Sequence, residues 1–131
     1  MDKKLILVSL IFIPLGIVLG AMGAHYLEKV GVTPERIKSF EVGVRYLIYT
    51  GIAFMALAGV VHKFDFNVRV TYRAVLWGTV LFSGSIFALT LLPSLGIENI
   101  KFLGPITPLG GLFMILGWLI LLIKFLRTYT R

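Results

Sequence analysis

The chain lacks cysteine and carries little charge. Of its 131 residues, 15% are Asp, Glu, Lys or Arg, and it has two histidines, His25 and His62. The absence of cysteine excludes disulfides, thiolate metal ligands and a cysteine nucleophile. A water-soluble domain carries roughly 25% charged residues. The sequence therefore has too few polar side chains to cover a globule in water.

Hydrophobic residues fill the sequence instead. They make up 58% of the chain, and the mean hydropathy is +0.95. These values are typical of an integral membrane protein, and the length allows one domain. The net charge of +7 also suits a nucleic-acid-binding protein, but no basic stripe or aromatic platform accompanies it. We therefore attribute the basic residues to membrane orientation and expect no nucleic-acid partner.

Four apolar runs are long enough to cross a bilayer core of about 30 Å. The first is uncharged but follows Lys3 and Lys4, so a cleaved signal peptide is the alternative to a retained helix. Its length favours the retained helix. Pro14 lies inside this run, where neighbouring helices can satisfy the carbonyl that a proline frees.

The polar segment after the first run contains a helix-start signal, Thr33 followed by Pro34. Thr is a favoured N-cap and Pro is favoured at the first helical position. We expect this helix to run into the second span, and we expect Pro93 to stop the third. The sequence thus predicts an all-α, single-domain bundle over residues 1–131, with four transmembrane helices at approximately 5–24, 42–61, 74–92 and 106–123.

Lys and Arg are distributed unequally between the two sides of the predicted bundle. The side with both termini and the second loop carries eight of them, and the opposite side carries five. The positive-inside rule therefore places both termini on the cytoplasmic side. We expect a multi-pass protein of the cell membrane.

Small residues recur at helical spacing along three of the predicted spans. Apolar side chains gain nothing by leaving lipid for each other, so membrane helices associate through close packing and interhelical hydrogen bonds. Glycine also occurs in membrane helices without any packing duty, and this remains the alternative at each position. The predicted packing positions are Gly16, Gly20 and Ala24 in the first span, Gly78, Ser83, Gly84 and Ser85 in the third, and Gly110, Gly111 and Gly117 in the fourth.

Ionisable and polar residues gather where the first, second and fourth spans meet the same membrane face. Glu41 and Arg45 are four residues apart with the acid first, the favourable order for an ion pair on a helix. Arg45 lies at or just inside the apolar core, where an unpaired charge is costly. We therefore expect a polar cluster at this outer face, made up of His25, Glu28, Glu41, Arg45, Tyr49 and Thr107.

This cluster has three interpretations. The first is a structural ion-pair network that fixes the entry of the second helix into the membrane. The second is a site for a small molecule, a quinone or a proton. The third is a metal site, which is disfavoured because the sequence has no HxxH or HExxH spacing. His25 and His62 fall at opposite faces, which excludes bis-histidine haem ligation. We expect no catalytic residue, no metal site and no cofactor.

Four stretches occur in an order that resembles a known family. They are "GAMGAHYLE", "FEVGVRYLIYTGIA", "LFSGSIFALTL" and "GPITPLGGLFMILGW". Together they resemble the membrane family called domain of unknown function 423, which is related to transmembrane protein 256 of eukaryotes. The resemblance implies four transmembrane helices, and the eukaryotic relatives are associated with mitochondria. The family pattern has a histidine where this chain has Thr50, which further disfavours a metal or haem site.

The family has no established activity, so the resemblance does not supply a function. Small-residue ridges and the lack of catalytic constellations favour a non-enzymatic accessory or structural subunit of a larger membrane complex, with a respiratory complex as the host suggested by analogy. The alternative is a small carrier, channel or quinone- or lipid-binding protein that uses the outer polar cluster. The partners we expect are membrane lipids and other membrane subunits or further copies of the chain.

Overall fold

The protein is a bundle of four long helices. The computed structural model describes residues 1–130. Two single-turn 3-10 helices, η1 and η2, lie in the connections, and the part of the chain described contains no strand. The elements in chain order are α1 (Asp2–Lys29), α2 (Pro34–Val60), η1 (Val61–Lys63), α3 (Arg69–Ser94), η2 (Lys101–Leu103) and α4 (Ile106–Tyr129).

The predicted all-α fold is confirmed, since all four helices are long and apolar enough to cross a membrane. The predicted spans fall within these helices apart from Val61, which begins η1, and their limits in a bilayer stay a prediction. Pro14 lies inside α1 without ending it. Thr33 caps α2 by accepting a hydrogen bond from the Arg36 backbone N–H (3.4 Å), and Pro34 occupies the first position.

Two glycines shape the turns at the outer end of the bundle, the end opposite the chain termini. Gly31 after α1 and Gly96 after α3 have φ of +82° and +83°, a conformation that glycine adopts without a Cβ penalty. After each glycine the chain turns back toward the end of its helix. After α3, for example, the Ile97 N–H donates a hydrogen bond to the Leu92 carbonyl (3.0 Å). The expectation that Pro93 stops the third helix is therefore wrong, because α3 continues through Pro93 to Ser94, two residues beyond the predicted end at Leu92, and the turn at Gly96 follows.

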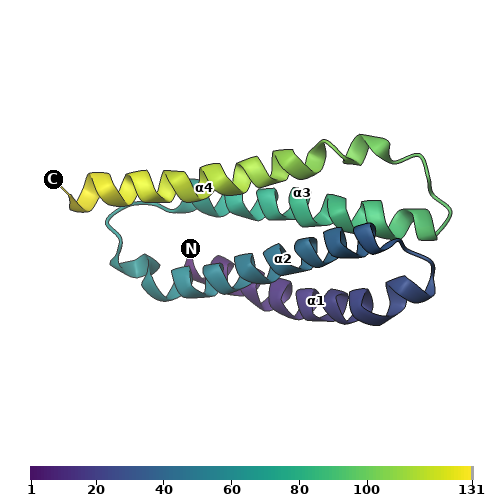
Figure 1. The fold of residues 1–131 in the computed structure, drawn as a ribbon. Coiled ribbons are helices and arrows are strands. Elements are labelled where there is room, and N and C mark those ends of the chain that lie inside the picture. Colours follow the sequence, from purple (N-terminus) through teal and green to yellow (C-terminus); the bar gives the residue numbers. More distant parts are fainter. Residues whose placement is uncertain (131) are drawn as a thin grey trace.

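The four helices form two tightly packed pairs (Figure 1), α1 with α2 and α3 with α4, and α2 and α3 join the pairs. Both ends of the chain lie at the same end of the bundle in Figure 1. We call it the inner end, and its cytoplasmic location stays a prediction. The main core cluster combines Leu5 and Phe12 of α1 with Phe54 of α2 and Val75 of α3. Since α1 supplies part of this core, it is an integral part of the fold.

Glycines of α1 face α2, as the sequence predicts for Gly16 and Gly20. A Cβ on Gly16 would collide with Ile48, and one on Gly20 would lie 3.3 Å from Val44. Ala24 is exposed, so the predicted ridge does not extend to it. Gly23 takes its place, because a Cβ there would lie 3.0 Å from the Phe40 ring.

The closest approach of two backbones is between α3 and α4. A Cβ on Gly110 would lie 2.7 Å from the Gly78 carbonyl oxygen, and one on Gly78 would lie 2.7 Å from the Met114 nitrogen. Gly117 is similarly close to Val75 at 2.6 Å. Gly111 makes only ordinary contact with the Phe82 ring, at 3.6 Å. Gly78, Gly110 and Gly117 thus lie where α3 and α4 are in close contact.

Gly84 is the exception among the predicted packing glycines. Apart from its neighbours in α3, no atom of the described chain lies within 4 Å of where its Cβ would be, and the residue is exposed. Its predicted role in packing these four helices is wrong. The neighbouring Ser83 and Ser85 point inward and are buried, so Gly84 falls on the outward face of α3.

Substitution at the α3/α4 contact has a definite expected outcome. Gly110→Ala should lower the free energy of unfolding in detergent by about 1–3 kcal/mol, because the added methyl group meets backbone atoms that cannot move aside. Gly84→Ala is the matched control, and it should be neutral or stabilise by up to ~1 kcal/mol. Denaturant titration followed by circular dichroism measures both. Equal effects of the two substitutions would contradict the assigned contact.

Ser83 provides a second test of how α2 and α3 are joined. Its hydroxyl donates to the Gly43 carbonyl across the interface at 2.7 Å. Ser83→Ala should cost about 0.6 kcal/mol, the average for a hydrogen bond between membrane helices. Ser9→Ala is the control, because the Ser9 hydroxyl donates only to the Leu5 carbonyl of its own helix. A smaller loss at Ser83 than at Ser9 would contradict the interhelical role.

Candidate functional site

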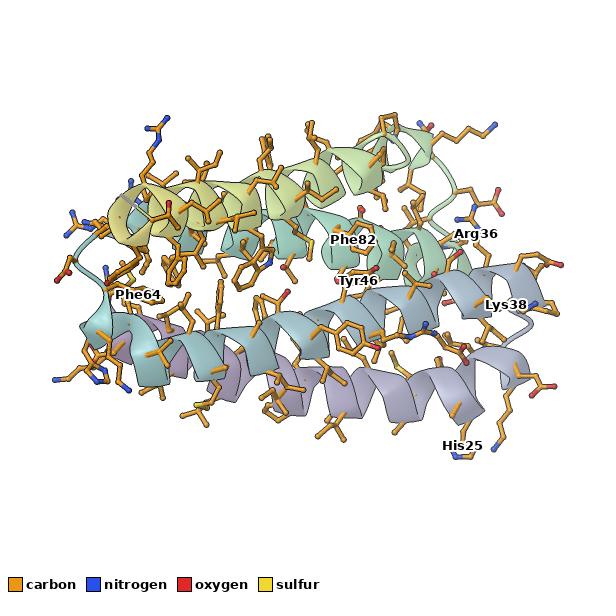
Figure 2. All side chains as sticks on the ribbon, turned by 60° about the vertical axis from the view of Figure 1, so that its left-hand side comes forward. His25, Arg36, Lys38, Tyr46, Phe64 and Phe82 are labelled. Atoms are coloured by element: carbon orange, nitrogen blue, oxygen red, sulfur yellow. The ribbon has the colours of Figure 1, made fainter. Side chains whose placement is uncertain are left out.

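The outer polar cluster expected from the sequence is not assembled. Figure 2 shows His25 pointing away from the bundle, because Gly23 and Leu27 occupy the face of α1 that packs on α2. Glu28 is also exposed. Among residues 1–130, the one ion pair within 4.0 Å joins the terminal ammonium group to Asp2 at the inner end. The predicted pairing of Glu41 with Arg45 is therefore wrong in this structure.

The remaining members of the predicted cluster lie on different sides of α2. Glu41 and Arg45 border a groove against α1 that also contains Gly20 and Gly23. Tyr49 borders a separate groove against α4. The rotation of the helix explains this, since eight residues turn an α-helix by about 80° beyond two full turns. Membrane level alone groups these side chains into one cluster, and it carries no information about this divergence around the helix.

Thr107 belongs to the α3/α4 interface. Its hydroxyl lies 2.5 Å from the Ser85 hydroxyl, which also donates to the Phe82 carbonyl (3.0 Å). The expectation that Thr107 joins the charged residues is wrong, because its partner is a hydroxyl on α3. Ser85 is one of the predicted packing positions, and it is buried.

Hydroxyl groups also link α2 to α3 in the middle of the bundle. The Thr79 hydroxyl donates to the Val75 carbonyl (2.8 Å), so it accepts from Thr50, 2.8 Å away. Both residues are almost fully buried. Thr50 stands where the family pattern has a histidine. The sequence analysis missed this contact, because two threonines 29 positions apart give no local signal.

A groove between α2 and α4 is a concave site within the apolar part of the bundle. Its volume is about 420 Å³, within the usual range for small-molecule sites. In Figure 2, Tyr46 lies beside Phe82, and the two ring centroids are 5.2 Å apart. We call this site the α2/α4 groove, and its lining residues are Tyr46, Tyr49, Thr50, Ala53, Phe82, Gly111, Met114, Ile115 and Trp118.

A larger cavity of about 930 Å³ lies at the inner end, where side chains of both charge signs surround it. A backbone hydrogen bond at Lys3, together with the terminal ammonium group, lowers the pKa of Asp2, so this carboxylate is ionised at neutral pH. The Tyr129 hydroxyl donates to the Lys63 carbonyl (3.0 Å), and Lys124 donates to the Asn67 carbonyl (2.6 Å). These two bonds attach the end of α4 to the loop between α2 and α3.

The grooves of the described chain are suited to binding, and they contain few chemically reactive side chains. Within residues 1–130, no three His, Asp or Glu side chains group closely enough to hold a metal ion. The α2/α4 groove contains no carboxylate, imidazole or amine. The arrangement suits recognition of an apolar or neutral molecule.

The missing ion pair can be tested by a double-mutant cycle with Glu41→Gln and Arg45→Gln. We expect the two effects on the free energy of unfolding to add within about 0.5 kcal/mol, as they do for residues that do not interact. Denaturant titration of the two single variants and the double variant in detergent supplies the three values. A coupling energy above about 1 kcal/mol would restore the pairing that the helix spacing suggests.

Comparison with known proteins shows which family the chain resembles. The model of the family described as "Protein of unknown function (DUF423)" matches residues 19–111. A UPF0382 membrane protein of Schizosaccharomyces pombe is 38% identical over 109 residues, which cover 83% of this chain and 90% of that protein. The UPF0382 membrane protein YwdK of Bacillus subtilis is 34% identical over 124 residues, which cover 92% and 94%. No solved structure matches the chain.

The aligned regions of these two relatives cover 83% and 92% of the chain, and both relatives are named as membrane proteins. Together with the four helices that are long and apolar enough to span a bilayer, they identify a multi-pass membrane protein. The chain belongs to the family of membrane proteins of unknown function designated DUF423.

Proposed function

We propose that the protein is a non-enzymatic accessory subunit that packs against other membrane helices in a larger complex. The observation that carries this proposal is the outward-facing Gly84 in the middle of α3, which nothing in the described chain covers. A glycine inside a helix costs about 1 kcal/mol relative to alanine. Contact with lipid does not offset that cost, whereas the close packing of a second helix backbone at the glycine can offset it.

The surroundings of Gly84 support a helix contact. Trp77 and Val80 precede it at seven and four residues, so the three share one face of α3, and both side chains are exposed. A bulky pair beside a glycine provides a ridge and a hollow, which is the shape that a packed helix fills. The connections between helices are short, so association of the described chain takes place through its membrane-spanning faces.

A respiratory or other energy-transducing complex is the host that we propose, by analogy with the mitochondrial association of the eukaryotic relatives. The alternative of a carrier or channel that uses the outer polar cluster has no observation in its favour, because the cluster residues lie on separate faces. The proposal therefore assigns the protein a structural role in which the charged residues orient the bundle and the helix faces bind the partner.

Photo-crosslinking in native membranes tests this proposal. Because the chain lacks cysteine, Val80→Cys introduces a single thiol that can carry a benzophenone maleimide one turn from Gly84. We expect a discrete adduct with a membrane protein that also co-purifies in constant ratio in mild detergent. Adding Gly84→Leu should reduce the adduct at least tenfold, because the larger side chain fills the hollow.

Gly59→Leu is the matched control, since Gly59 also faces open space and lies on α2. It should leave the adduct unchanged. An adduct with lipid alone, or equal yields from the Gly84→Leu and Gly59→Leu variants, would overturn the proposed contact. An adduct with twice the mass of the chain would show that the partner is a second copy of the chain, so the protein would form a homo-oligomer and not a subunit of a larger complex.

A further inference from the structure

The α2/α4 groove has features that a face packed only by lipid does not need. Tyr46 and Tyr49 of α2 line one wall, and Trp118 of α4 lines the other. Tyr46 and Tyr49 are 42% and 54% exposed, so the groove is open to the bundle surface. Its place in the apolar part of the helices makes it accessible from the membrane.

The groove contains three hydrogen-bond donors that the chain leaves without an acceptor. Neither phenol hydroxyl nor the indole N–H forms a hydrogen bond with any group of residues 1–130, whereas the Thr50 hydroxyl in the same groove is bonded to Thr79. A donor in hydrocarbon without an acceptor costs several kcal/mol. An occupant that carries acceptor oxygens would satisfy these donors.

Trp118 differs from an ordinary interfacial aromatic residue in its position along the membrane normal. Trp and Tyr are enriched at the two membrane surfaces, where their polar atoms reach water. Trp118 instead lies near the middle of α4, about 18 Å along the helix axis from its first residue. An acceptor carried by a membrane-soluble molecule would satisfy its N–H at this position.

The chemistry of the walls narrows the class of occupant. The groove contains no charged side chain, and Arg45 borders the separate groove against α1. A phosphate headgroup would therefore lie without a counter-charge. Tyr46 meets Tyr49 and Phe82 edge to face, with centroids 5.9 Å and 5.2 Å apart. These aromatic walls suit a flat ring.

We propose that the α2/α4 groove binds a lipid-soluble quinone. The ring carbonyls accept hydrogen bonds from the tyrosine hydroxyls and the Trp118 N–H, the ring packs on the aromatic walls, and the apolar tail leaves through the open side into lipid. Phospholipid esters offer similar carbonyl acceptors, but they carry a charged phosphate that the groove does not match. This inference does not depend on the proposed subunit role, because the groove is complete in one copy of the chain.

The test uses the full chain in nanodiscs of phosphatidylcholine and decylubiquinone as the probe. Since the chain has two tryptophans, Trp77→Phe leaves Trp118 as the only one, and quinones quench tryptophan fluorescence at contact. We expect saturable quenching of Trp118. Tyr46→Phe with Tyr49→Phe should raise the dissociation constant about tenfold or more, because two hydrogen bonds are lost while both rings remain.

A second variant fills the groove with a larger side chain. Gly111→Leu should abolish the saturable component, since its Cβ fits beside Phe82 at 3.6 Å and the rest of the side chain occupies ligand volume. Gly59→Leu, which lies outside the groove, should leave the dissociation constant within twofold. Trp118→Phe, which retains Trp77, should show only the linear quenching caused by partition of the quinone into the bilayer.

Three outcomes overturn the proposal. The first is linear quenching of equal slope for Trp118 and Trp77. The second is an unchanged dissociation constant in the tyrosine double variant, or in Tyr49→Phe alone if the double variant elutes as misfolded protein. The third is mass spectrometry of the natively purified chain that finds a phospholipid, lost in Gly111→Leu, in place of a quinone. None of these outcomes depends on a protein partner, so the subunit proposal is judged separately.

Discussion

The contact of the α3 and α4 backbones at Gly78 and Gly110 is the constraint on which the rest of the bundle depends. In lipid no hydrophobic driving force brings two helices together, so the packing energy must come from the close approach itself. Cβ positions 2.7 Å from backbone atoms leave no room for any other residue. This contact fixes the rotation of α4 about its own axis. Thr107 then reaches Ser85, and Trp118 faces the groove against α2.

The fold could be predicted from the sequence because a membrane helix is marked by its own residues, through apolar length, capping residues and the spacing of small residues. Apolar length defines the helices, Thr33 with Pro34 defines the start of α2, and the spacing of Gly16 and Gly20 defines the face toward α2. Each of these signals acts within one or two turns of a helix. The same rules failed at Ala24 and Gly84, because small size marks a site where a neighbour can approach and does not say whether one does.

The polar cluster could not be predicted in the same way, because it depends on the rotation of three helices relative to one another. Membrane level groups His25, Glu41 and Thr107 along the bundle axis, but it carries no information about direction around that axis. The rotations follow from the contacts of Gly23 with Phe40 and of Gly78 with Gly110. Charges near the membrane surface also tolerate an unpaired state, since long side chains reach the headgroup region. Arg45 therefore needs no partner within the chain.

Satisfied and unsatisfied polar groups divide the bundle into a structural part and a part available for binding. Ser83, Thr79 and Ser85 bond to carbonyls or hydroxyls inside the chain, and each joins or stiffens helices at a buried position. The donors of Tyr46, Tyr49 and Trp118 lie on the open side of the same helices and have no such acceptor. Among the buried hydroxyls of the described chain, that of Thr71 alone lacks a partner, and the packing of the bundle gives no reason for three further donors on its open side. An acceptor from outside the chain accounts for these three donors. The uncharged aromatic walls then favour a neutral ring that carries carbonyl oxygens.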